Sequence, residues 1–176
     1  AHGIVHRDIS PKNVIMASDG AHLIDLGISR MHAEKPMGHD TTILGTWGFA
    51  PAEQYGFAQT DSRSDIYSLG RLLGYLLTGV YPTDGDYERL LNDDDVVDAH
   101  TRAVIARACA LEPSARPQTV TRFMDELMGR APLPDALAAD SHGGEDGVRR
   151  ARRGAGRIGR TLRRLRDSVA ALPMST

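Results

Sequence analysis

The chain has 176 residues, of which 41% are hydrophobic and 25% charged, as is ordinary for a globular protein with one core. Its single cysteine, Cys109, excludes an internal disulfide and indicates a reducing compartment, so we expect a cytoplasmic protein. No apolar run approaches the ~20 residues that a membrane-spanning helix needs. The protein would lie near a membrane if its full-length form carries a transmembrane segment elsewhere. The first residue is Ala, so we expect a processed or truncated chain.

The net charge of −2 conceals two regions of opposite sign. Residues 1–139 carry 12 basic and 19 acidic side chains, a balance of −7, whereas residues 140–176 carry 9 and 4, a balance of +5. Hydrophobic periodicity also ends near residue 129. We therefore expect a folded domain over residues 1–129, a flexible linker over 130–147 and a basic tail over 148–176.

The first motif is the stretch HRDISPKN at residues 6–13, in which an Asp precedes an Asn by five positions. The triplet Asp25-Leu26-Gly27 follows twelve residues after Asn13. One Asp that holds a hydroxyl, with an Asn and a second Asp that hold a metal ion, is the minimum set for phosphoryl transfer. Each piece alone is common in proteins, but the three in this order favour catalysis.

Between the two motifs, residues 14–17 and 22–25 are short β-prone runs that flank the sequence Ser18-Asp19-Gly20-Ala21. Asp-Gly between two such runs predicts a β-hairpin. The hairpin would place Asn13 and Asp25 at one edge of a rigid element, where two oxygen ligands suffice for Mg²⁺ because phosphates and water supply the rest.

Residues 28–60 lack periodicity and end in the run GTWGFAPAEQY at residues 45–55. Together with the D-I-S-P-x-N loop, this run resembles the end of the activation segment in bacterial Ser/Thr protein kinases. The usual A-P-E reads Pro51-Ala52-Glu53 here, with the proline one position early. Two further departures are Ser10, where the family usually has Lys, and Leu26 in place of the Phe of D-F-G.

The next element is a predicted helix that starts at Ser62 with an apparent capping box to Asp65 and stops at Thr78-Gly79. Its apolar residues recur at 3.6-residue spacing, which indicates a buried central helix. Shorter helices are expected over residues 87–91, 98–109 and 117–129, the last with an apolar core stripe. In the family, a helix that begins D-x-Y-S-L-G crosses the large lobe, and its Asp, here Asp65, accepts hydrogen bonds from the catalytic-loop backbone.

The loop EPSARP at residues 112–117 resembles the family's D-P-x-x-R-P loop. The resemblance implies that Arg116 forms an ion pair with Glu53 and ties the activation segment to the base of the lobe. The fold implied is mainly α, a kinase-like C-terminal lobe whose small β-hairpin carries the catalytic and metal loops. No Gly-rich loop or strand lysine precedes residue 6. The N-terminal lobe is therefore missing from this sequence and expected upstream.

The resemblance also implies the cofactors ATP and Mg²⁺ and a role for each site residue. Asp8 would accept the proton of a protein Ser or Thr hydroxyl, and Lys12 would contact the γ-phosphate in place of the absent Lys. Asn13 and Asp25 would hold Mg²⁺ on the nucleotide, and Ile15 would form part of the adenine floor. Four more residues concern the activation segment. Arg7 would pair with a phosphate on Thr41 or Thr42, and Thr46 would bond the catalytic Asp.

We interpret the chain as a Ser/Thr protein kinase that transfers phosphate from ATP, inactive as the fragment given because nothing grips the nucleotide. One alternative is a pseudokinase-like regulatory or scaffold lobe. A less favoured alternative is a small-molecule phosphotransferase, which shares the Asp-Asn motif but lacks the 45–55 run and the Arg loop. The Arg-rich tail would be a solvated segment, or an amphipathic helix that contacts an anionic membrane, nucleic acid or the acidic domain.

Overall fold

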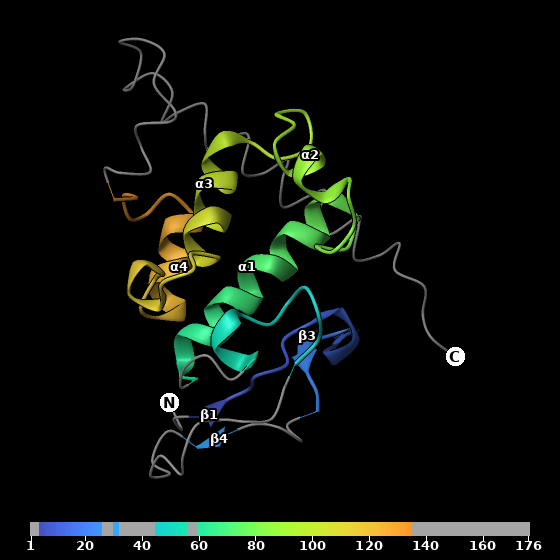
Figure 1. Cartoon of the computed structure of the whole chain (residues 1–176), viewed down its shortest axis with the longest axis vertical. Coiled ribbons are helices and arrows are strands. Elements are labelled where there is room, and N and C mark those ends of the chain that lie inside the picture. The colour runs from blue at the N-terminus through green and yellow to red at the C-terminus, as the bar shows by residue number, and fades with distance from the viewer. Residues whose placement is uncertain (1–3, 26–29, 32–44, 56–59, 135–176) are drawn as a thin grey trace.

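The structure, a computed structural model, describes residues 4–25, 30–31, 45–55 and 60–134. This part of the chain is mainly helical, with two small antiparallel sheets. Figure 1 shows α1 (Ser62–Thr78) at the centre of the helices. It packs against α2 (Tyr87–Leu91) and α3 (Ala99–Ala108), and α3 packs against α4 (Val120–Leu127). The predicted linker is described only to residue 134, and the basic tail lies outside the described residues.

Helix α1 begins and ends where its sequence predicts, but it is capped differently. Asp61 is the N-cap residue, and its carboxylate accepts a hydrogen bond from the backbone N–H of Arg63 at 2.8 Å. The expected capping box from Ser62 to Asp65 is wrong, because the Asp65 carboxylate binds backbone N–H groups of the 6–13 loop instead. At the other end, Gly79 adopts a φ of +72°, as a left-handed C-terminal stop requires.

The core of the helical part is a cluster of ten buried side chains around α1: Ile66, Leu73, Leu77, Tyr87, Leu91, Val97, Val104, Ile105, Ala108 and Phe123. Two glycines of α1 let its neighbours approach closely. A Cβ on Gly70 would lie 2.8 Å from the Cβ of Ala108, and one on Gly74 only 2.0 Å from the Tyr87 hydroxyl oxygen. Both positions therefore need glycine for contact, although neither has a positive φ.

Helix α4 is shorter than the predicted span of residues 117–129, because Thr119 caps it by accepting from the N–H of Arg122 at 3.0 Å. Its apolar stripe is core only in part: Phe123 is buried, but Val120 and Met124 are 51% and 40% exposed. The reason is that Glu126 is fully buried and forms ion pairs with Arg107 and Arg122 on the inward face.

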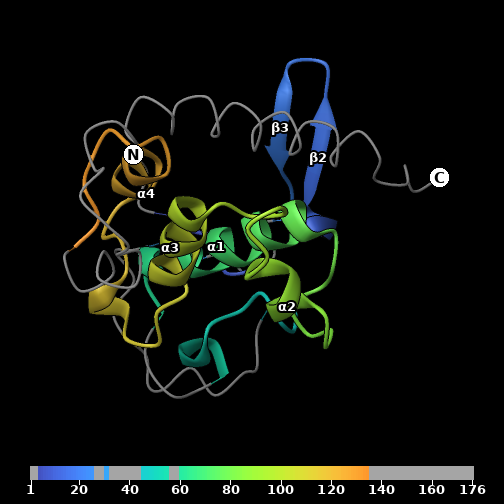
Figure 2. The ribbon, with the colours of Figure 1, turned by 90° about the horizontal axis from the view of Figure 1, so that it is seen from above.

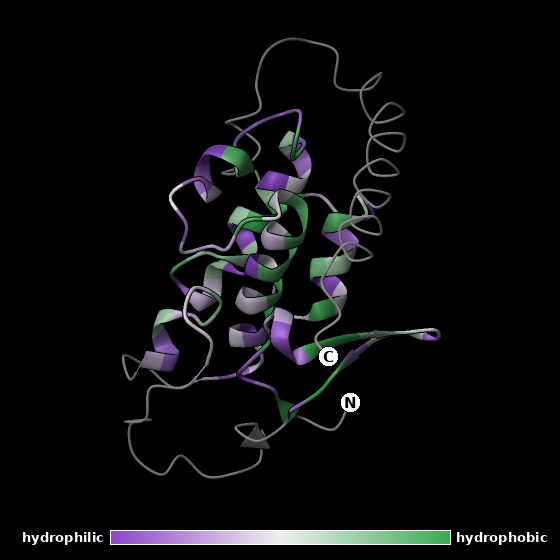
Figure 3. Ribbon diagram, turned by 90° about the vertical axis from the view of Figure 1, so that its right-hand side faces the viewer, coloured by the Kyte–Doolittle hydropathy of each residue, from purple (hydrophilic) through white to green (hydrophobic). Residues whose placement is uncertain are grey.

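The predicted hairpin is present as β2 (Val14–Ala17) and β3 (Gly20–Leu23), paired from Val14–Leu23 to Ala17–Gly20. The second strand begins at Gly20 rather than residue 22, because a two-residue turn closes the hairpin. Figure 2 shows the hairpin projecting from the helices, and Figure 3 shows hydrophobic residues along its strands. Ile15, Met16 and Leu23 are each about half-exposed.

A second sheet, which the sequence did not predict, pairs β1 (Ile4–Val5) with β4 (Arg30–Met31). It joins the chain just before the 6–13 loop to the chain beyond Asp25. Within the described residues, no helix is long and apolar enough to cross a membrane.

Candidate active site

The carboxylate of Asp8 lies at the centre of the candidate site, with donors on both oxygens. Thr46 donates to Oδ1 from its backbone N–H at 2.8 Å and from its hydroxyl at 2.6 Å. Asn13 Nδ2 donates to Oδ2 at 2.8 Å, and Lys12 Nζ lies 3.1 Å from the same oxygen. The structure thus brings together four residues that the sequence selected, from two segments 38 positions apart.

These contacts set the charge state of Asp8. Burial raises the pKa of the carboxyl, but hydrogen bonds from Thr46, Lys12 and Asn13, with the positive charge of Lys12, outweigh it. The pKa of Asp8 therefore lies below its ordinary value of 3.8. At neutral pH the side chain is an anion with oxygens fixed in direction, as a group that orients a hydroxyl and accepts its proton must be.

The backbone before Asp8 is held in an unusual conformation by α1. Arg7 has a φ of +71°, in the left-handed region that non-glycine residues rarely adopt. The N–H groups of His6 and Arg7 donate to the two Asp65 carboxylate oxygens at 2.8 and 2.9 Å, which is the contact expected for Asp65. Burial raises the pKa of Asp65, and the two backbone hydrogen bonds oppose that rise.

The carbonyl of Arg7 has its own partner in the 45–55 segment. Gln54 Nε2 donates to it at 2.5 Å, and Gly45, at a φ of +101°, comes close enough that a Cβ there would lie 3.1 Å from the same oxygen. The strained turn is therefore fixed at both its N–H and C=O groups, so the position of Asp8 depends on α1 and on the 45–55 segment together.

The metal-binding candidates Asn13 and Asp25 lie at the same end of the hairpin. The N–H of Ile24 donates to the Asn13 carbonyl at 2.9 Å, which brings the next residue, Asp25, to the base of β2. His6 Nε2 contacts the Ile24 carbonyl at 3.1 Å and so connects this end of β3 to the loop of Asp8. Asp25 is exposed and has a φ of +62°.

The chemistry of this pair fits a magnesium ion bound with a nucleotide. Asn13 uses its amide nitrogen to donate to the carbonyl and carboxylate of Asp8, which leaves its amide oxygen available to a metal ion. An amide oxygen and an exposed carboxylate are hard ligands, and Mg²⁺ bound to phosphates needs only one or two from the protein. In the described part of the chain, no group of three His, Cys, Asp or Glu side chains could form a metal site of another kind.

Arg7 contacts a residue that the sequence did not select. Its Nη2 donates to the hydroxyl of Thr60, the second residue before α1, at 2.5 Å. The expected phosphate acceptors Thr41 and Thr42 lie outside the described residues, as does Leu26. Ile15 lies on β2 with its side chain 49% exposed, available for contact with a flat ring.

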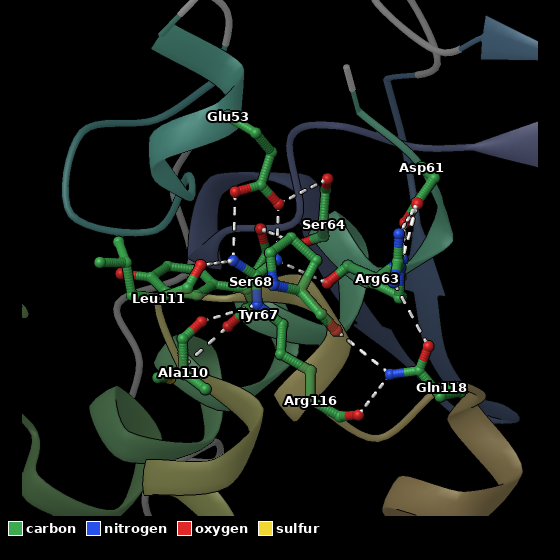
Figure 4. Close-up of polar contacts among 12 residues, drawn as sticks. Glu53, Asp61, Arg63, Ser64, Tyr67, Ser68, Ala110, Leu111, Arg116 and Gln118 are labelled. Atoms are coloured by element: carbon green, nitrogen blue, oxygen red, sulfur yellow. Dashed lines mark hydrogen bonds and ion pairs between the residues drawn. The ribbon is translucent and has the colours of Figure 1, made fainter. Parts of the chain in front are cut away.

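The predicted ion pair between Glu53 and Arg116 is present and buried, with both residues under 5% exposed (Figure 4). Arg116 donates to both carboxylate oxygens, from Nη1 at 2.5 Å and from Nη2 at 3.1 Å. Its remaining donors bind the carbonyls of Arg63, Ala110 and Leu111 at 2.8–3.1 Å. All five N–H groups of the guanidinium are thus used, and one side chain joins the activation-segment end, α1 and the loop after α3.

Comparison with known proteins agrees with this geometry. Residues 1–133 match the family described as the protein kinase domain. The chain belongs to the protein kinase family. It is 30% identical over 141 residues to the serine/threonine-protein kinase PknD of Mycobacterium tuberculosis. The aligned region covers 79% of this chain and 20% of PknD. It is 32% identical over 161 residues to PknB of Mycolicibacterium smegmatis, covering 80% and 26%.

A third relative, PknL of Mycobacterium tuberculosis, is 41% identical over 101 residues, which cover 53% of this kinase-family chain and 25% of PknL. The chain spans about a fifth to a quarter of the length of these curated relatives. The fold is therefore that of a protein kinase domain, mainly helical in the described residues, and the relatives that it resembles are bacterial Ser/Thr kinases.

Sequence reasoning missed three residues of this site. Ser10 is fully buried, and its hydroxyl lies 3.2 Å from that of Thr46. Gln54 and Thr60 fix the carbonyl and the guanidinium of Arg7 from 47 and 53 positions away. The position of Gln54 next to Glu53 in the matching run was the one available signal. No local pattern pointed to Thr60.

Proposed function

We propose that this chain is the large lobe of a Ser/Thr protein kinase, which transfers the γ-phosphoryl group of ATP to Ser or Thr hydroxyls of proteins. The observation that carries the proposal is the environment of Asp8. Its Oδ1 receives two hydrogen bonds from Thr46 and its Oδ2 is bound by Asn13 and Lys12. A carboxylate fixed in this way, beside an ammonium group and two oxygen ligands for Mg²⁺, suits a hydroxyl nucleophile and a phosphate.

Each side chain has a distinct task in this proposal. Asp8 orients the acceptor hydroxyl and takes its proton, and Lys12, whose side chain is 61% exposed, reaches the transferred phosphate. Asn13 and Asp25 hold Mg²⁺, which neutralises phosphate charge when bound. Ile15 offers an apolar surface to the adenine ring. Arg7 is a positioning residue, whose guanidinium binds a phosphate on the activation segment in competition with Thr60.

We also propose that residues 1–176 do not transfer phosphate by themselves. The half-exposed apolar side chains of the hairpin support this, because they are suited to contact with a nucleotide and with a second lobe. Phosphoryl transfer depends mainly on position, and a misplacement of ~1 Å can cost ~10²-fold in rate. A chain without groups that grip the α- and β-phosphates should therefore have little turnover.

The test uses the full-length protein that contains residues 1–176, with radiolabelled ATP, Mg²⁺ and a general protein substrate. We expect incorporation of phosphate on Ser and Thr, and a loss of about 10²–10⁴-fold on Asp8→Asn, because a positioned general base contributes that much. Asp25→Ala should also strongly reduce transfer and should raise the Mg²⁺ concentration needed for the residual rate.

The matched control is Asp19→Asn, which removes an exposed carboxylate from the turn of the same hairpin. Its rate should equal that of the unmodified protein. Full activity of Asp8→Asn would contradict the proposal. Inactivity of the full-length protein towards every Ser/Thr substrate would favour a regulatory scaffold instead. Transfer by the 176-residue chain that is lost on Asp25→Ala would contradict the second part.

A further inference from the structure

A pocket of about 400 Å³ opens next to the site, beside the segment that follows Thr46. Its walls include three aromatic rings, one cation and a short loop after α1, contributed by Trp47, Tyr55, Tyr67, Arg71, Pro82 and Thr83. None of these residues contacts Asp8 through a hydrogen bond or ion pair among the described residues. Trp47, however, directly follows Thr46, whose hydroxyl lies 2.6 Å from the Asp8 carboxylate. The pocket wall therefore includes the residue that directly follows a side chain bound to Asp8.

The two loops that form the pocket are built to approach each other. Gly48 has a φ of +85°, and a Cβ on it would lie 2.8 Å from Cγ2 of Thr83. Arg71 lies between the loops and donates to a carbonyl of each, from Nε to Gly48 at 3.0 Å and from Nη2 to Pro82 at 3.1 Å. The pocket is thus a built feature, with a guanidinium held in its wall by the backbone.

The aromatic walls make this surface suited to contact with another polypeptide. Trp47 is the only tryptophan of the chain, and it is 73% exposed. It is supported from the side by Tyr55, with ring centroids 5.4 Å apart in an edge arrangement. Tryptophan and tyrosine at the mouth of a pocket are typical anchors of protein interfaces.

The charge in the pocket identifies the class of side chain that it would bind. The third nitrogen of Arg71, Nη1, has the carboxylate of Glu88 at 3.8 Å, which is an ion pair but beyond hydrogen-bond distance. Glu88 is 69% exposed, whereas Arg71 is 18% exposed, so water screens the acid far more than the cation. Among the described residues, Arg71 has no other acidic partner. A carboxylate that enters the pocket could accept from Nη1 directly, whereas a basic side chain would be repelled.

We propose that this pocket binds an acidic side chain, Glu or Asp, that neighbours the phosphorylated Ser or Thr in the protein substrate. The proposal rests on the proposed function for the identity of the polypeptide as a substrate. Arg71 is the specificity-determining residue, and Trp47 and Tyr55 pack against the stem of the bound side chain. Glu88 competes with the ligand for the same guanidinium and so weakens its binding.

The test measures peptide binding to the 176-residue chain through the emission of Trp47, with no nucleotide present. The probes are four blocked nine-residue Gly/Ala peptides with a central Ser, flanked on both sides by Glu, Gln, Leu or Lys. We expect the Glu peptide to bind about tenfold more tightly than the Gln peptide, as a charge-assisted hydrogen bond implies. Its affinity should fall as salt is raised.

Variants then assign the effect to Arg71. Glu88→Gln removes the competing acid and should raise the affinity for the Glu peptide by about two- to fivefold, with the affinity for the Gln peptide unchanged. The control Glu112→Gln removes one exposed acid outside the pocket and should change the affinity for neither peptide. Arg71→Gln should lower the affinity for the Glu peptide to that for the Gln peptide. If circular dichroism shows that Arg71→Gln is unfolded, the change in affinity for the Glu peptide with Glu88→Gln still tests the proposal.

Equal or tighter binding of the Gln, Leu or Lys peptide would overturn the proposal. So would an unchanged affinity of the Glu peptide for Glu88→Gln, or no response of Trp47 emission up to millimolar peptide. These outcomes are separate from the kinase assay, because binding needs neither ATP nor turnover. Selective binding of the Glu peptide, with no phosphate transfer by the full-length protein, would support the pocket proposal and contradict the proposed kinase activity.

Discussion

Replacement of Arg116 by Ala should strongly destabilise the domain. The structure defines the loss: the buried Glu53 carboxylate keeps one neutral donor, the hydroxyl of Ser64 at 3.0 Å, and three backbone carbonyls lose theirs. Removal of one partner from a buried ion pair costs about 3–5 kcal/mol. Small domains are stable by only about 5–15 kcal/mol, so this one change would remove a large part of the free energy of unfolding.

Urea denaturation followed by far-ultraviolet circular dichroism measures the effect, and a loss of this size should lower the midpoint by about 2 M. Arg116→Lys keeps the charge but not the planar fork, so we expect a smaller loss. In a double-mutant cycle with Glu53→Gln, the two losses should be non-additive by about 2 kcal/mol. The control is Arg130→Ala, which breaks an exposed pair with Asp125 and should change stability by under about 1 kcal/mol. An effect of Arg116→Ala no larger than that of Arg130→Ala would refute the reasoning.

Three further predictions concern other parts of the site. Thr46→Val removes the hydroxyl donor, so the pKa of Asp8 should rise in a ¹³C carboxyl titration. Because the pKa of Asp8 is lowered by folding, this residue stabilises the fold above pH 3.8 and the contribution is lost as the pH falls through the folded value. The acid limb of stability against pH should therefore be shallower in Thr46→Val, and identical curves would contradict this. Burial raises the pKa of the Cys109 thiol to about 12, and its side chain is partly buried, so iodoacetamide should label the native protein much more slowly than the protein unfolded in urea; equal rates would argue otherwise. Gly48→Ala should destabilise by about 1–3 kcal/mol because φ is positive there, whereas Gly85→Ala, with open space around it, should have little effect on the melting temperature.

The sequence was most informative where several motifs had to meet. Spacing alone joined Asp8, Asn13 and Asp25, and the resemblance added Thr46; the structure contains the hydrogen bonds between Asp8 and both Asn13 and Thr46. The resemblance predicted the ion pair between Glu53 and Arg116, which lie 63 positions apart. No local pattern pointed to it. The catalytic and ligand roles of these residues stay predictions.

The sequence was least informative where a local pattern pointed to the wrong partner. Asp65 has the spacing of a capping residue, but the capping box is wrong and Asp61 caps α1. The resemblance, in contrast, predicted the contact that the Asp65 carboxylate makes with the 6–13 loop. In α4 the 3.6-residue pattern predicted a fully apolar stripe, yet the buried Glu126 occupies part of the inward face and Val120 remains exposed. A periodic pattern reports which residues share a face, but not which neighbour covers it.

The two contact glycines of α1 have a consequence for how the domain folds. Each glycine inside a helix costs roughly 1 kcal/mol relative to alanine, so residues 62–78 alone would form a poor helix. The same absence of side chains admits Tyr87 and Ala108 to the helix surface. Helix α1 therefore becomes stable only as α2 and α3 dock on it, and the three helices should acquire structure together rather than one after another. Native-state hydrogen exchange should then show a single opening free energy shared by all three.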